Sequence, residues 1–269
     1  MTQKIPFESE YVLHKLTQDN LKELFDLELV ASEIKLHDSR LDNLAFNKKS
    51  NSFVIIEYKN ELNLNVLNQA QKYYDLVQNN EKFFIEQVGN TENVDFKNTQ
   101  VLIIGPEFSK NQKEAKNNFE LWEVTLFDNG KVTYENLHNN ELKTLKVNLD
   151  DLKLTEETLL EDKPEEVIEL YIEFKNRLYE EFNELDMKFL IDAVSIKAQN
   201  EFMCIVNVKN SIKIHYYTKK LEDIENKTRD ISEITTGGPL SNYELTLNHK
   251  NIDYAIDLIK QVYVQKVKK

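Results

Sequence analysis

The sequence predicts an α+β protein in which a mixed sheet flanked by helices precedes a smaller α+β domain. First, the apolar run at 53–59 follows a shorter strand pattern at 41–47 across four polar residues, as in a β-hairpin. Second, apolar residues at helical spacing and further buried-strand runs alternate up to about residue 135. Third, a long amphipathic pattern begins after Pro164 and is followed by several short strand patterns.

The length of 269 residues suits one large domain or two ordinary ones. Hydrophobic residues make up 41% of the chain, which is enough to build a core. The segment at 141–163 is rich in Asp and Glu, with scattered leucines, and it ends next to a proline. We therefore expect a domain at 1–140, an acidic linker at 141–163 and a second domain at 164–269.

Cysteine usage and hydropathy indicate a cytoplasmic protein with no membrane segment. Cys204 is the single cysteine, so no internal disulfide can form. No apolar run approaches the roughly 18 residues that a membrane helix needs. The first residues also lack the apolar region of a signal peptide.

The net charge of −13 disfavours a general nucleic-acid coat protein, because phosphate binding depends on Lys and Arg. Basic residues nevertheless gather in the sequence near the predicted hairpin. They form a candidate basic rim, with an ordinary solvated surface as the alternative: Lys35, His37, Arg40, Lys48, Lys49, Lys59 and Lys72.

The register of the hairpin can be predicted from the length of its loop. A four-residue loop pairs Asn47 with Ser52 and, counting outward, places Asp42 opposite Glu57. Side chains alternate along a strand, so Glu57 and Lys59 share one face. The sequence therefore predicts that these two carboxylates and one ammonium lie together, provided that the register does not slip by one residue.

Two adjacent carboxylates against an apolar sheet repel each other and are costly to bury. A divalent cation such as Mg²⁺ offsets that cost, since it takes carboxylate oxygens, waters and phosphate oxygens as ligands. The alternative is an ordinary ion pair between Glu57 and Lys59 on a half-exposed strand.

A helix is expected after the strand, over residues 64–77. Leu67, Ala70, Tyr74 and Val77 recur at helical spacing and form its apolar stripe. Gln69 and Tyr73 are four residues apart and share an adjacent face.

The ordered set Arg40-Leu41-Asp42, Ile56-Glu57-Tyr58-Lys59 and Gln69-x-x-x-Tyr73 resembles the PD-(D/E)xK nuclease superfamily, especially its RecB-like branch. The resemblance includes the upstream residues at 29–33 and extends to about residue 135. One departure is that no proline precedes Asp42. The resemblance implies a restriction-endonuclease-like sheet in the first domain.

The resemblance also implies a metal-dependent nuclease that cleaves phosphodiester bonds in nucleic acid, with DNA as the expected form. Asp42 and Glu57 would hold Mg²⁺ or Mn²⁺, and Glu33 or Glu23 is a candidate third ligand. Lys59 would position water or neutralise the phosphate, and Gln69 would orient a site group, whereas Tyr73 is assigned to packing. The alternative is a nuclease-fold interaction or regulatory protein without catalysis. A homodimer is one assembly to consider.

The first residues and the second half of the chain indicate less about function. Residues 1–16 suggest a short strand or arm, followed by a helix at 20–25. Strands are expected at 189–197, 202–208, 212–217 and 243–247, with a final helix at 252–264. The segments at 228–232, 243–247 and 253–259 resemble a small uncharacterised domain found behind such nuclease-like domains. No activity follows from that resemblance, although a ligand-sensing or protein-binding role that controls the first domain is a third possibility.

Overall fold

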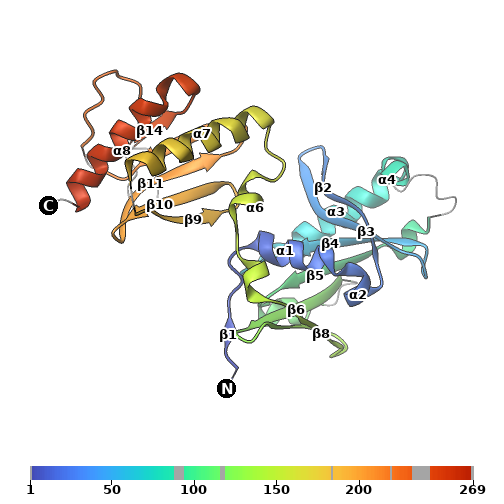
Figure 1. Cartoon of the computed structure of the whole chain (residues 1–269). Helices are drawn as coiled ribbons and strands as arrows, with labels where there is room; N and C mark the ends of the chain where they lie inside the picture. Colours follow the sequence, from blue (N-terminus) through green and yellow to red (C-terminus); the bar gives the residue numbers. More distant parts are fainter. Residues whose placement is uncertain are drawn as a thin grey trace. The chain divides into compact units, whose positions relative to one another are not determined.

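The computed structural model describes residues 2–87, 94–115, 119–182, 184–218, 220–231 and 243–267 (Figure 1). The chain divides into two compact units, Met1–Lys153 and Leu154–Lys269. Within the described residues, no helix is both long enough and apolar enough to cross a membrane.

The described residues of the first unit form eight strands and several helices, which follow one another in this order: β1 Lys4–Ile5, α1 Glu10–Asp19, α2 Leu21–Phe25, β2 Glu28–Leu36, β3 Ser39–Asn47, β4 Ser52–Tyr58, α3 Val66–Asn79, α4 Glu81–Gln87, η1 Phe96–Asn98, β5 Gln100–Gly105, α5 Lys110–Lys113, β6 Phe119–Phe127, β7 Lys131–Asn136, β8 Leu142–Lys146 and η2 Leu149–Leu152. The second unit contains, in chain order, α6 Glu156–Leu160, α7 Glu165–Glu181, β9 Asp186–Leu190, β10 Ala193–Ala198, β11 Glu201–Val208, β12 Ile212–Tyr216, β13 Arg229–Asp230, β14 Tyr243–Thr246, η3 His249–Asn251 and α8 Ile252–Val267.

The strands of the first unit form one mixed sheet in the order β2-β3-β4-β5-β6-β7-β8, with β1 added beside β6. The pairs β4–β5 and β5–β6 are parallel, and the other pairs are antiparallel. The parallel strand β5 is connected to β4 through α3 and α4, because parallel neighbours need a long crossover. The predicted fold class, a mixed sheet flanked by helices, is confirmed.

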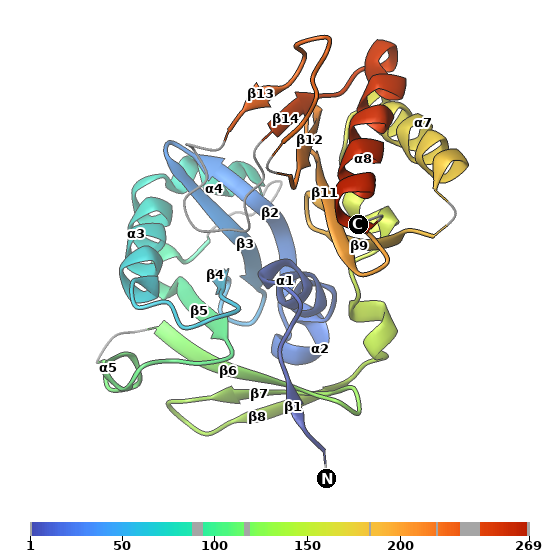
Figure 2. The same ribbon diagram turned by 90° about the vertical axis from the view of Figure 1, so that its left-hand side faces the viewer.

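Helices cover both faces of this sheet, with α3 and α4 on one side and α1 and α2 on the other (Figure 2). On the α3 face, Phe53 and Ile55 of β4 pack with Ala70 and Val77 of α3 in one apolar cluster. The alternate residue Tyr58 faces α1, where its ring stacks on His14 at a centroid distance of 4.6 Å. The centre of β4 is therefore buried on both faces, as expected for an inner strand of an α/β sheet.

The prediction of a short strand or arm over residues 1–16 is correct only for β1 at Lys4–Ile5, because the later residues of this range belong to the helix α1. The side chain of Ser9 accepts a hydrogen bond from the backbone N–H of Val12 and caps the helix. Leu13 and Leu16, together with Val12, then form its buried stripe. The apolar residues that suggested a short strand are part of this helical stripe.

The segment at 141–163 is also different from the expected linker. Its first part forms β8, an edge strand paired with β7. It continues through η2 into α6, which begins at a Thr155 cap and buries Leu159. Only Leu145 of β8 is buried, so the strand lacks the apolar alternation that identifies strands in a sequence.

The second unit is an antiparallel sheet in the order β13-β14-β12-β11-β10-β9, packed against α7 and α8. Ile212, Ile214 and Tyr216 of β12 join the apolar cluster with these helices, and the residues between them point to the opposite face. The single strand expected at 189–197 is wrong, because a turn at 191–192 divides it into β9 and β10.

Candidate functional site

The β3–β4 hairpin has the loop and the register that the sequence predicts. Its four-residue turn spans 48–51, and the Oδ1 atom of Asn47 accepts hydrogen bonds from the backbone N–H groups of Lys49 and Ser50, at 3.0 and 3.3 Å. Asn47 pairs with Ser52, and the same register continues to Asn43 opposite Ile56. One step beyond this pair, the register brings Asp42 and Glu57 to the end of the ladder.

Asp42 provides a side-chain hydrogen-bond acceptor at the point where β3 and β4 separate. Its Oδ2 atom accepts a hydrogen bond from the backbone N–H of Tyr58 at 3.0 Å. This bond fixes the carboxylate beside the end of β4, and the Asp42 side chain is only half-buried. Asp42 is therefore held in place and still reachable from outside the protein.

A buried polar network on the opposite face holds the same strand end in position. The hydroxyl of Tyr58 donates to Asn43 Oδ1 at 2.7 Å, and Asn43 Nδ2 donates to Gln18 Oε1 at 2.8 Å and to Ser32 Oγ at 3.0 Å. Asn43 is fully buried, so these bonds satisfy a side chain that would otherwise be destabilising. Asn43 and Tyr58, which are next to Asp42 and Glu57 in the sequence, are consequently held in position by this network.

Glu57 is a carboxyl group without solvent exposure. Its Oε1 atom accepts a hydrogen bond from Lys59 Nζ at 2.7 Å, but its Oε2 atom has no hydrogen-bond partner. Burial, with the nearby Asp42 charge, raises the pKa of Glu57 to about 8, although Lys59 acts in the opposite direction. An unsatisfied buried oxygen beside a second carboxylate is what a divalent cation would complete.

Lys59 lies just after β4, where its backbone N–H donates to Ile104 O at 2.9 Å and continues the ladder with β5. The neighbouring residue Gly105 has no side chain, and a Cβ atom there would lie 3.2 Å from the Lys59 carbonyl oxygen. The Lys59 ammonium also donates to Tyr58 O at 2.7 Å. Burial lowers the pKa of Lys59, but the charge and hydrogen bond of Glu57, together with the charges of Glu10 and Asp42, outweigh burial and leave the pKa raised.

The helix α3 brings Gln69 and Tyr73 to the same site. Gln69 Nε2 donates to the Tyr73 hydroxyl at 2.9 Å. Burial raises the pKa of Tyr73, and the charges of Glu57 and Asp42 add to that increase. The Tyr73 ring packs in the apolar cluster, as expected for a packing residue, and its hydroxyl accepts the hydrogen bond from Gln69.

Glu10 is a site residue that the sequence analysis missed. It is the first residue of α1, and its Oε1 atom lies 3.6 Å from Lys59 Nζ. The available signal was Ser9, a good N-cap immediately before a run with helical spacing.

Glu33 and Glu23 were expected to be candidate third ligands. The structure pairs Glu33 with Arg40 at 2.8 Å, and Glu23 lies exposed on α2. Among the residues that the structure describes, no group of three or more His, Cys, Asp or Glu side chains is placed to hold a metal ion. The pair Asp42 and Glu57 still suits Mg²⁺, which commonly takes one or two carboxylates and completes its shell with waters and phosphate oxygens.

The expected basic rim is partly neutralised by neighbouring carboxylates. Lys48 pairs with Glu28 at 2.6 Å, and Lys49 pairs with Asp26 at 2.7 Å. Both pairs are solvent-exposed and therefore weak, but they reduce the positive potential beside the hairpin.

The Lys59 ammonium should stabilise the metal-free first unit mainly at high pH. With Lys59→Met, ionised Glu57 would be buried without a counter-charge, at a cost of about 3 kcal/mol. At low pH Glu57 is protonated, so the cost should be much smaller. Urea unfolding followed by the fluorescence of Trp122, the single tryptophan, measures this unit.

Lys113→Met is the matched control, since the pair between Lys113 and Glu123 is partly exposed and worth no more than about 1 kcal/mol. Equal losses for the two variants at high pH would contradict the assigned role of Lys59.

No protein-family model matches the chain. An uncharacterized protein from Haemophilus influenzae is 27% identical to it over 281 residues, which cover 95% of this chain and 93% of the relative. The similarity therefore spans both units.

A chain in the structure of the EndoMS-dsDNA2 complex is similar to part of this chain, with 16% identity and a TM-score of 0.32. The match covers 43% of this chain and 44% of that chain. A likeness this partial adds no argument about the function of the site.

Proposed function

We propose that the first unit is a metal-dependent nuclease that cleaves phosphodiester bonds in nucleic acid. The observation that carries the proposal is the buried Glu57 carboxyl, whose Oε2 atom lacks a partner beside Asp42 and whose Oε1 atom is held by Lys59. The residues at the site also match the ordered pattern from Asp42 to Gln69 that resembles the PD-(D/E)xK superfamily.

Asp42 and Glu57 are the residues that would hold Mg²⁺ or Mn²⁺. Such an ion, when bound, lowers the pKa of a bound water and stabilises the charge that develops on phosphoryl oxygens. Asp42 is oriented for this role by the Tyr58 N–H, and Glu57 is oriented by Lys59.

Lys59 provides positive charge where an anionic phosphodiester would approach the two carboxylates. Its side chain is 14% exposed and its ammonium is fixed by two hydrogen bonds, so little reorganisation is needed to stabilise added negative charge. Gln69 would orient a site group or contact the nucleic-acid backbone, through its position beside the Tyr73 hydroxyl.

A second candidate is a nuclease-fold interaction protein without turnover. The observations in its favour are the net charge of −13 and the ion pairs that neutralise Lys48 and Lys49 near the site.

A cleavage assay separates the two candidates. Wild type and Asp42→Asn are incubated with duplex DNA, single-stranded DNA and RNA, in Mg²⁺, Mn²⁺ or chelator. The nuclease proposal expects metal-dependent cleavage by wild type and none by Asp42→Asn, which keeps the side-chain shape but removes the charge. Absence of cleavage by folded wild type on all substrates with both ions favours the interaction protein.

A further inference from the structure

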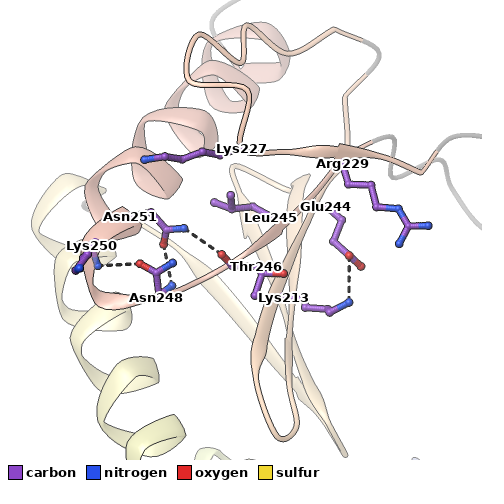
Figure 3. Close-up of a pocket in the computed structure, with 9 residues that line it drawn as sticks. All are labelled: Lys213, Lys227, Arg229, Glu244, Leu245, Thr246, Asn248, Lys250 and Asn251. Atoms are coloured by element: carbon purple, nitrogen blue, oxygen red, sulfur yellow. Dashed lines mark hydrogen bonds and ion pairs between the residues drawn. The ribbon is translucent and has the colours of Figure 1, made fainter.

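The second unit has an open pocket of about 690 Å³ whose lining is rich in cations (Figure 3). Four basic side chains, Lys213, Lys227, Arg229 and Lys250, line it together with one carboxylate, Glu244. In a chain with a net charge of −13, such a concentration of positive charge marks a candidate anion site.

The sheet assembles these residues from distant parts of the sequence. Strand β14 lies between β12 and β13, with Lys213 opposite Thr246 and Arg229 opposite Glu244. Residues at directly opposed positions have side chains close together. The cations therefore stand around β14 because of strand order, and Lys250 is added from η3 just before α8.

The carboxylate in the pocket is already neutralised. Glu244 Oε1 lies 3.1 Å from Lys213 Nζ, and Glu244 Oε2 lies 2.9 Å from the Nε2 atom of His215. Lys227 contacts Glu225 and lies over the ring of Tyr254. Lys213 and Lys227 are therefore already paired. Because Glu244 is paired as well, it repels an incoming anion only weakly.

The other two cations are available. Within the described part of the chain, no carboxylate forms an ion pair with Arg229 or Lys250, and both side chains are exposed. The backbone N–H of Lys250 is bonded to Asn248 Oδ1 at 3.0 Å. An anion would therefore be bound by the charged side chains and not by this backbone N–H group.

The lining indicates which kind of anion would fit. None of the nine lining residues that the structure describes is aromatic, so this lining offers no ring on which a nucleotide base could stack. Proteins that bind single strands combine cations with stacking aromatic side chains. Contacts to a duplex backbone need only cations and polar donors such as the Thr246 and Asn248 side chains.

We propose that this pocket binds phosphate groups in the backbone of double-stranded nucleic acid, an inference that rests on the nuclease function proposed for the first unit. The contact is independent of sequence, since it reaches phosphates and no base edges. It supplies positive charge that the neutralised residues near the hairpin do not.

The test measures binding of a labelled duplex by fluorescence anisotropy, in chelator and over a range of salt concentrations. The full-length double variant Arg229→Ala/Lys250→Ala should bind more weakly than wild type at low salt. Its slope of log affinity against log salt concentration should be smaller by about two, one for each lost phosphate contact. Arg229→Gln/Lys250→Gln, which keeps long polar side chains, should give the same change if the alanine variant does not fold.

Lys188→Ala is the matched control, because Lys188 is an exposed lysine on β9, at the opposite edge of the same sheet. An unchanged slope for the double variant, or an equal decrease for Lys188→Ala, would overturn the proposal. Tighter binding of single strands than of duplex would do so as well. If inorganic phosphate displaces the duplex at a matched phosphate concentration, the pocket is instead a site for a small anion. That result would overturn the duplex assignment.

Binding in chelator is independent of cleavage, so the two proposals can fail separately. If wild type binds duplex through this pocket but cleaves nothing with Mg²⁺ or Mn²⁺, only the nuclease function fails. If wild type cleaves and the double variant binds as wild type does, only the pocket assignment fails.

Discussion

Glu57→Gln should reduce cleavage by about a thousandfold or more, while it stabilises the metal-free protein above neutral pH. A lost carboxylate ligand removes several kcal/mol of transition-state stabilisation, and each 1.4 kcal/mol is a factor of ten in rate. The amide avoids the cost of a buried charge, and its Oε1 atom can still accept the hydrogen bond from Lys59. Single-turnover cleavage and thermal melting, each with and without Mg²⁺, measure both effects.

The melting experiment also reports directly on metal binding. Millimolar Mg²⁺ should raise the melting temperature of wild type by mass action and should leave that of Glu57→Gln almost unchanged. Glu33→Gln is the matched control, because Glu33 is paired with Arg40 and stands apart from the two carboxylates. A loss of cleavage in Glu33→Gln equal to that in Glu57→Gln would show that the site has been assigned to the wrong carboxylates.

The β3–β4 hairpin could be predicted from the sequence in detail. A four-residue polar loop and the period of two along each strand together fix its register, and the observed pairs from Asn47–Ser52 to Asn43–Ile56 follow it. The helix that carries Gln69 could be predicted equally well, because its apolar positions recur at helical spacing.

Other parts could not be predicted because their physical cause is not local. The bond from the Tyr58 N–H to Asp42 arises where the ladder ends, and no residue pattern marks that point. Strand β8 was interpreted as linker because it buries a single side chain at a sheet edge. The approach of Glu10 to Lys59 depends on tertiary packing of α1.

The cationic pocket illustrates the same limit. Lys213, Arg229 and Lys250 are separated in sequence and have no common motif. They come together because β14, which is last in the chain among the strands, lies between β12 and β13. Strand order of this kind is decided by the packing of the whole unit and not by any single segment.

The metal-free first unit should become less stable as the pH rises from about 4.5 to about 8. The ordinary pKa of a glutamate is 4.5, whereas burial and the charge of Asp42 raise that of Glu57 to about 8. Between these values the folded state holds a proton that the unfolded state releases, so unfolding becomes more favourable as the pH increases. The stabilisation is complete below the lower value and lost above the upper one. Its size is on the order of a few kcal/mol.

Urea unfolding in chelator, followed by Trp122 fluorescence at several pH values, measures this dependence. Other titrating groups are shared with Glu57→Gln, so the difference in stability between the two proteins isolates the Glu57 carboxyl. That difference should favour Glu57→Gln increasingly as the pH rises. Mg²⁺ should reduce it, because metal binding is coupled to release of the same proton. A difference that stays constant from about pH 5 to about pH 9 would mean that Glu57 keeps an ordinary pKa in the fold. The electrostatic argument for a metal at this site would then lose its basis.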